Sequence, residues 1–161
     1  TLRDLPIAAR RVTPPAMKRI VVGSDHAGLA LKRAMVEALR RRGYTVDDLG
    51  THDDEPCDYP DLGRAVASAV SNGDAPRALL VCGSGVGMAI TANRYPRVRA
   101  VVCSEPYSAA MARRHNDANV LCLGARVVGV GLAEQILDAF LEAEFEGGRH
   151  ARRVAKIDGE G

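Results

Sequence analysis

Residues 77–93, RALLVCGSGVGMAITAN, decide the fold class of this chain. An uninterrupted apolar run of strand length, 77–82, passes directly into the glycine-rich turn 83–87 and then into a stretch of helical composition. A short apolar strand that feeds a helix through a tight turn is typical of a parallel βαβ unit, whose strand is buried on both faces. The stretch therefore predicts an α/β protein.

The same alternation of apolar strand and helix continues in both directions along the chain. Four more strands are expected, at residues 19–23, 44–49, 98–104 and 119–123. Helical periodicity follows each strand, and a basic segment at 147–157 is expected to form one more helix. Five parallel strands with helices on both faces make a single-domain, doubly wound (Rossmann-like) three-layer sandwich.

Length and composition bound the domain organisation. The chain has 161 residues, 47% hydrophobic and 26% charged, which fits one ordinary globular domain. Residues 1–17 carry three Arg and three Pro without periodicity, so we expect an N-terminal extension there and the domain at 18–161. The longest nearly apolar run, 78–90, is too short to cross a bilayer.

Charge and aromatic content argue against macromolecular ligands. The 22 Lys and Arg nearly balance the 20 Asp and Glu, and the chain has four Tyr, two Phe and no Trp. We therefore expect neither a nucleic-acid partner nor a membrane surface as partner. The four cysteines, at 57, 82, 103 and 122, show no Cys-x-x-Cys spacing, so we expect reduced thiols in a cytoplasmic protein.

The predicted topology directs attention to the carboxyl ends of the strands, where ligands of doubly wound sheets bind. These ends are residues 24–26, 82–87, 104–105 and 124–126. The 83–87 loop lets backbone N–H groups approach an anion at a helix N-terminus. It lacks the Lys of a Walker A motif, and its third glycine comes one residue early for a dinucleotide fingerprint. An anion cradle and a ligand-free tight turn both remain open.

Cys82 and two histidines are candidates for proton transfer. Cys82 ends its strand at the N–H-rich loop, where a thiolate would be stabilised; the alternative is a buried core thiol. Asp25 and His26 follow the first strand, and His115 and Asn116 end a predicted helix. Such groups suffice for acid–base chemistry without a metal, although spacing also leaves open a zinc site of His26, His115 and Cys82.

The basic C-terminal segment has two interpretations. Arg149 and Arg153 are four residues apart and share one face of a helix. They form either a solvated basic face or a phosphate clamp, because the guanidinium fork matches phosphate oxygens. Arg126, after the fifth strand, is a candidate to join them.

Several motifs together resemble the ribose-5-phosphate isomerase B family, the sugar-phosphate isomerases of the lactose and ribose type. They are GSDHAG at 23–28, DYPD at 58–61, VCGSGVGMAITAN at 81–93, RAVVCSEPYSAAMARRHNDANVLCLGAR at 99–126 and EGGRHARRV at 146–154. The likeness covers about residues 18–157. It implies a metal-independent, cofactor-free enzyme that interconverts D-ribose 5-phosphate and D-ribulose 5-phosphate through a cis-enediol(ate).

The resemblance also implies a role for each matched residue. One branch of the family uses a cysteine base, at Cys82, and the other a carboxylate, which falls at Met88, so the chain resembles the cysteine branch. Ser84 matches a hydroxyl that moves protons between O1 and O2. His115 matches the residue that opens the furanose ring, with Asp25 and Asn116 on sugar hydroxyls. The anion-hole loop corresponds to Gly83, Gly85, Val86 and Gly87. The phosphate-binding and site-lining positions are His26, Arg126, Arg149, Arg153, Tyr59 and Asn93.

The family likeness further implies a homodimer, often paired into tetramers, in which His115 and Arg126 reach each site from the partner. Two other functions stay open at this point. One is the isomerisation of allose 6-phosphate or galactose 6-phosphate, which needs a longer cavity. The other is a non-catalytic sugar-phosphate-binding module that keeps the anion loop without turnover.

Overall fold

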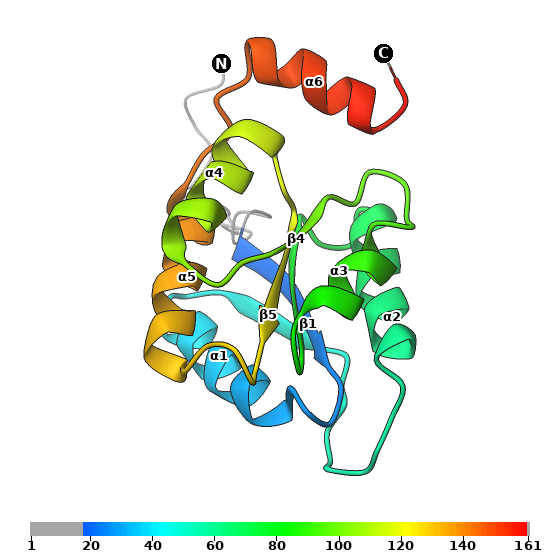
Figure 1. Cartoon of the computed structure of the whole chain (residues 1–161), viewed down its shortest axis with the longest axis vertical. Coiled ribbons are helices and arrows are strands. Elements are labelled where there is room, and N and C mark those ends of the chain that lie inside the picture. Colours follow the sequence, from blue (N-terminus) through cyan, green and yellow to red (C-terminus); the bar gives the residue numbers. More distant parts are fainter. Residues whose placement is uncertain (1–17, 161) are drawn as a thin grey trace, which may run out of the picture.

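The computed structural model describes residues 18–160, so the expectations for residues 1–17 and for Gly161 lie outside the described residues. Strands and helices alternate along this part of the chain (Figure 1). The strands are β1 (Arg19–Ser24), β2 (Thr45–Asp48), β3 (Arg77–Cys82), β4 (Ala100–Val102) and β5 (Val120–Gly124). The helices are α1 (Leu29–Arg41), α2 (Tyr59–Ser71), α3 (Val86–Ala92), α4 (Pro106–Asn116), α5 (Val130–Glu142) and α6 (Arg149–Ile157).

The five strands form one parallel sheet in the order β2-β1-β3-β5-β4. Helices α1, α4 and α5 cover one face and α2 and α3 the other, which gives three layers (Figure 1). Each face has its own apolar core, and every residue of β5 is buried. The predicted doubly wound sandwich is confirmed, and so is the helix predicted in the basic C-terminal segment.

Strand β4 is shorter than the expected 98–104 because side chains replace part of its ladder. The amide of Asn93 accepts from the N–H of Ala100 at 2.7 Å and donates to its carbonyl at 2.9 Å. The amide oxygen of Asn119 accepts from the N–H of Arg99 at 2.8 Å. These bonds hold the entry to β4 in an irregular conformation, so regular pairing begins only at Ala100.

Helix α4 fixes the direction in which His115 lies. Its first turn is capped by Glu105, whose carboxylate accepts from the N–H of Ser108 at 3.0 Å, and this bond lowers the pKa of Glu105. The helix then runs back along the sheet, and its last turn meets the start of β4, where Arg99 Nε donates to the carbonyl of Asn116 at 3.1 Å. His115 therefore lies where the strands begin.

We call the two ends of the sheet the carboxyl edge, where the strands end, and the amino edge, where they begin. Helix α6 lies across the amino edge (Figure 1), and its C-cap residue Asp158 pairs with Arg99 at 2.8 Å. Within residues 18–160, no helix combines the length and the apolar character needed to cross a membrane.

Candidate active site

The centre of the carboxyl edge is the sulfur of Cys82, which accepts the backbone N–H of Gly85 at 3.1 Å. Cys82 is only 5% exposed. Gly85 has φ +80°, and a Cβ there would lie 2.8 Å from Cγ2 of Val102 and 3.0 Å from the carbonyl carbon of Leu123. Only glycine fits this turn, and the turn aims an N–H at the thiol. The loop is therefore built to stabilise negative charge on Cys82 or beside it.

Asp25 and Arg126 lie at the same edge, just after the ends of β1 and β5, the two strands that flank β3. Ser24 pairs with Val81, so Asp25 and Cys82 end neighbouring strands. The Asp25 carboxylate accepts the N–H of Gly28 at 2.9 Å, which fixes its direction at the start of α1. The N–H of Arg126 donates to the carbonyl of Gly83 at 3.0 Å.

The guanidinium of Arg126 lies over the loop of its own chain. A Cβ on Gly83 would stand 3.5 Å from its Nη1 atom. The family resemblance implies that this arginine comes from a partner, whereas here no partner is needed to bring it beside the loop. Arg126 thus adds a positive charge to the anion loop from the same chain.

Tyr59, Ser84 and His26 line the rim of this edge. A Cβ on Gly87 would lie 2.5 Å from the Tyr59 ring. The ring can therefore pack against residue 87 only because that residue is glycine. Ser84 is exposed, and its hydroxyl accepts the N–H of Val86 at 3.3 Å. His26 Nδ1 accepts the N–H of Cys57 at 3.2 Å, which assigns the proton of the neutral ring to Nε2.

Two other cysteines are buried in the cores of the sheet. Cys103 and Cys122 are 4% and 0% exposed, and Cys82 belongs to the same core as Cys122. Burial, with the carboxylate of Glu105 adding to it, raises the pKa of Cys103 to about 11, and burial raises the pKa of Cys122 as well. Met88, at the position of the carboxylate in the other branch of the family, is fully buried.

The structure does not bring all predicted site residues together within one chain. His115, Asn116, Arg149 and Arg153 belong to the end of α4 and to α6, at the amino edge. The two ends of a six-residue strand such as β3 are roughly 17 Å apart. One chain therefore does not assemble the zinc set of His26, His115 and Cys82, nor a clamp that joins Arg126 to the arginines of α6.

Asn93 also lies away from Cys82, because helix α3 separates it from the anion loop. Both atoms of its amide are engaged by the backbone of Ala100. In this chain Asn93 holds the start of β4, which is a structural role.

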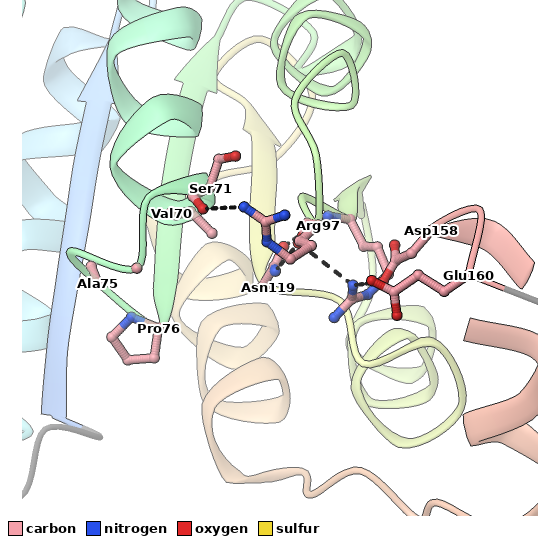
Figure 2. A pocket seen from close by; sticks show the side chains of 10 residues that line it. Val70, Ser71, Ala75, Pro76, Arg97, Asn119, Asp158 and Glu160 are labelled. Atoms are coloured by element: carbon pink, nitrogen blue, oxygen red, sulfur yellow. Dashed lines mark hydrogen bonds and ion pairs between the residues drawn. The ribbon is translucent and has the colours of Figure 1, made fainter. Parts of the chain in front are cut away.

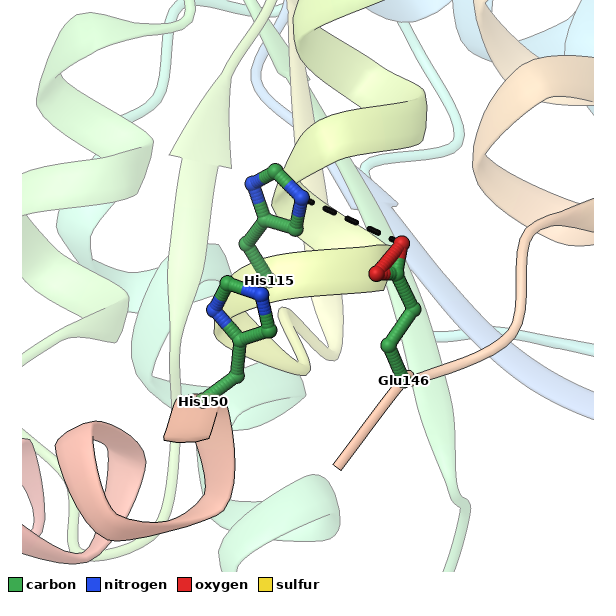
Figure 3. Close-up of side chains that lie close together, drawn as sticks. All are labelled: His115, Glu146 and His150. Atoms are coloured by element: carbon green, nitrogen blue, oxygen red, sulfur yellow. Dashed lines mark ion pairs between the residues drawn. The ribbon is translucent and has the colours of Figure 1, made fainter. Parts of the chain in front are cut away.

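At the amino edge His115 has two neighbours that the sequence analysis did not single out, His150 and Glu146 (Figure 3). The two imidazole rings stack with centroids 4.3 Å apart, and His115 Nε2 lies 3.9 Å from Glu146 Oε1. Burial, together with the charges of His115 and Arg149, lowers the pKa of His150. The chain turns at Gly147 and Gly148, both of which have positive φ. This glycine pair is the feature of the sequence that could have indicated a turn beside His150.

Two hollows of about 560 and 630 Å³ also lie at the amino edge, and neither is lined by Cys82 or the 83–87 loop. Figure 2 shows the first, where Arg97 donates to the carbonyl of Ser71 at 2.9 Å. Arg99, which also lines it, pairs with Asp158 and Asp117. Its cations are thus already engaged by protein groups, and the Ser71 hydroxyl donates to the carbonyl of Pro96 at 2.8 Å. The carboxyl edge remains the candidate active site.

Comparisons with known proteins show the family of the chain. The Ribose/Galactose Isomerase family matches residues 20–157. Ribose-5-phosphate isomerase B of Escherichia coli K12 is 52% identical over 141 residues, which are 88% of this chain and 95% of that protein.

Solved structures give the same relationship. Ribose-5-phosphate isomerase B of Clostridium thermocellum superposes with a TM-score of 0.86 at 53% identity, over 88% of this chain and 95% of that one. The Mycoplasma genitalium enzyme, solved with bound ribulose-5-phosphate, superposes with a TM-score of 0.84 at 43% identity, over 88% and 94%.

Proposed function

The chain belongs to the ribose/galactose isomerase family, and from this premise we propose that it interconverts D-ribose 5-phosphate and D-ribulose 5-phosphate with Cys82 as the base. Relatives named ribose-5-phosphate isomerase B support the substrate, and one of them was solved with ribulose-5-phosphate bound. The observation that carries the proposal is the Cys82 sulfur at the carboxyl edge, 3.1 Å from a backbone N–H donor.

The reaction moves one proton between two carbons. The Cys82 thiolate takes the proton from C2 of the open-chain aldose, and the electron pair left behind forms the C1–C2 double bond of an enediolate. The oxygen on C1 then carries the negative charge. The Ser84 hydroxyl passes a proton from O2 to O1, and the Cys82 thiol returns its proton to C1, which completes the ketose.

The 83–87 loop stabilises the intermediate electrostatically. Its N–H groups lie at the N-terminus of α3, and Arg126 adds a guanidinium beside Gly83. Fixed donors of this kind are worth about 3 to 4 kcal/mol each where they have been removed from other enzymes. Asp25, fixed by the N–H of Gly28, is placed to bind a sugar hydroxyl next to Cys82.

The remaining groups come, in our proposal, from a second copy of the chain. His115 would give a proton to the ring oxygen when the furanose opens, and Arg149 and Arg153 would bind the phosphate. All three lie at the amino edge, too far from Cys82 of the same chain for one pentose phosphate to touch both sets. A two-fold dimer, alone or paired into a tetramer, brings the amino edge of one copy to the carboxyl edge of the other and makes two equivalent sites.

An isomerase assay with matched substrates tests the proposal. Ribose 5-phosphate, allose 6-phosphate and galactose 6-phosphate are compared in the presence of a chelator, in heavy water. We expect the highest kcat/KM for ribose 5-phosphate. We also expect deuterium at C1 of the ketose, because the proton on the Cys82 thiol exchanges with the solvent before it is returned. A preference for a six-carbon substrate would reassign the substrate, and binding of all three without turnover would make the chain a sugar-phosphate-binding module.

We also propose a cytoplasmic location. All four cysteines are free thiols, and the proposed mechanism needs one of them reduced. Mass spectrometry of alkylated protein from whole cells tests this, because an oxidising compartment would leave some of these thiols unavailable to the reagent.

A further inference from the structure

We infer that His115, Glu146 and His150 form a binding site for a divalent transition-metal ion such as Zn²⁺, and that an ion bound there inhibits the isomerase. The binding site stands on its own geometry. The inhibition rests on the proposed function, because it follows from the role given to His115.

Three separate segments converge on this site (Figure 3). His115 ends α4, His150 lies in the first turn of α6, and Glu146 belongs to the connection between α5 and α6. One ligand atom from each lies within 4.8 Å of the other two. The N–H of Glu146 donates to the carbonyl of Arg114 at 3.0 Å, which holds the connection against the end of α4. The three side chains are therefore gathered by the backbone before any ion arrives.

The ligand set suits zinc. Two histidines and one glutamate hold Zn²⁺ in known sites with a fourth position open to water. Bonds of about 2.0–2.2 Å would place the ligand atoms roughly 3.3 Å apart, so the present spacing must contract by about 1.5 Å at most. The side chains of Glu146 and His115 are 49% and 39% exposed and free to make that movement. The histidine rings, now 9° from parallel, must also tilt so that their lone pairs converge.

The surrounding charge determines which ions fit. Arg114 and Arg149 lie at the same two helix ends, and Arg153 lies one turn further along α6. These cations repel a metal ion, and the carboxylate of Glu146 offsets only part of that repulsion. Mg²⁺ and Ca²⁺ prefer sets of oxygen ligands and depend on negative charge, so this site disfavours them. Ions with a strong affinity for imidazole, such as Zn²⁺, Ni²⁺ and Cu²⁺, are the ones that it selects.

Inhibition follows from the shared ligand. A histidine nitrogen bound to a metal has no lone pair left to move a proton. With His115 engaged, opening of the furanose ring would lose its catalyst, and the ion would also occupy space beside Arg149 and Arg153. The site would then link isomerase activity to the free concentration of a transition metal.

The test uses the full chain, stripped with a chelator and desalted, and Zn²⁺ added as its chloride. Isothermal titration calorimetry measures binding without turnover, and the isomerase assay is run in parallel on the same samples. The variants are Glu146→Gln, which is half-exposed, and His150→Gln. Glu144→Gln is the control, since Glu144 is an exposed carboxylate two residues away. Cys82→Ala removes the thiol that would otherwise compete for zinc.

We expect one Zn²⁺ per chain in the unmodified protein, in Glu144→Gln and in Cys82→Ala. Affinity should fall at least tenfold in both Glu146→Gln and His150→Gln, and Mg²⁺ should give no saturable binding. Activity of the unmodified protein should fall in step with occupancy and return with chelator, whereas Glu146→Gln should keep its activity at the same Zn²⁺ concentration.

Absence of stoichiometric binding, binding unchanged in both ligand variants, or binding lost in Cys82→Ala would overturn the site. Stoichiometric binding with unchanged turnover would overturn the inhibition, and a metal-stripped chain without isomerase activity would instead count against the proposed function.

Discussion

The two edges of the sheet carry different groups of the proposed mechanism. The carboxyl edge holds a thiol, backbone N–H donors and Asp25, on loops that the strand ends position. The amino edge holds His115 and the arginines of α6, which lie beside an ion-pair network of Arg99, Asp117 and Asp158. In the proposed mechanism the base lies at one edge and the phosphate clamp at the other, so a single chain would carry two half-sites.

The two edges also differ in how their polar side chains are paired. At the amino edge the buried cations are paired: Arg113 donates to Asp117 at 2.8 Å, and Arg99 is held by two carboxylates. At the carboxyl edge Ser84 and Arg126 are exposed. Removing a group from the carboxyl edge should therefore change turnover more than stability.

The largest effect should come from Cys82→Ala. A general base contributes about 10²- to 10⁴-fold to rate, so we expect kcat to fall about a thousandfold while thermal unfolding changes little. Cys57→Ala is the matched thiol deletion, since its backbone N–H still bonds to His26, and it should keep most of the activity. More than a few per cent of residual activity in Cys82→Ala would move the base to another residue.

A smaller loss should follow Gly87→Ala. The new Cβ would lie 2.5 Å from the Tyr59 ring and would displace it. Displacements of about 1 Å can lower a reaction rate up to a hundredfold. We expect kcat/KM to fall ten- to a hundredfold. Gly131→Ala, at a position with nothing within 4 Å, is the control and should leave kcat/KM unchanged. Equal activity in the two variants would remove Tyr59 from the site.

At the amino edge Arg153→Ala should raise KM for the sugar phosphate about tenfold, the equivalent of about 1.4 kcal/mol, with a smaller effect on kcat. Arg152→Ala changes the neighbouring exposed arginine on the same helix and should leave KM near its original value. If the two variants shift KM equally, the basic segment acts only through its general charge.

The smallest effect concerns the second thiol of the carboxyl edge, Cys103, and stability rather than rate. In the unfolded chain this thiol loses its proton near its ordinary pKa, whereas in the folded chain it keeps the proton up to about pH 11. The folded state thus binds more protons between pH 9 and 11, and its stability must fall as the pH rises. At pH 10 this effect should lower the free energy of unfolding of the unmodified protein by roughly 1 kcal/mol. Cys103→Ala should not show this decrease, and urea unfolding measures it in both proteins. Parallel pH curves for the two proteins would contradict the raised pKa.

Sequence reasoning predicted the elements well where one pattern decides them. The strand 77–82 has the predicted bounds, because its apolar run ends at a glycine, and helix α4 ends at Asn116 as predicted. It failed at β4, where Asn93 and Asn119 bond to the backbone from distant positions. Those contacts exist only after folding, so periodicity within 98–104 could not reveal them.

For the site, the sequence identified candidate residues but did not show at which edge of the sheet each of them lies. The edge at which His115 lies could have been predicted, because a helix that follows a parallel strand runs back toward the amino edge. The convergence of Glu146 and His150 on His115 could not, since it depends on how α6 packs across the end of the sheet.

The central claim is that two copies of the chain complete each other's half-sites, and subunit complementation tests it most directly. Cys82→Ala and His115→Ala are unfolded, mixed in equal amounts and refolded, and subunit exchange is verified by mass. Random pairing makes about half the dimers mixed, and each mixed dimer has one intact site and one with both lesions. We predict the return of about a quarter of the wild-type activity, above the residual activity of either parent. No activity above the parents, with mixed dimers present, would show that Cys82 and His115 serve the same site from one chain or different functions altogether.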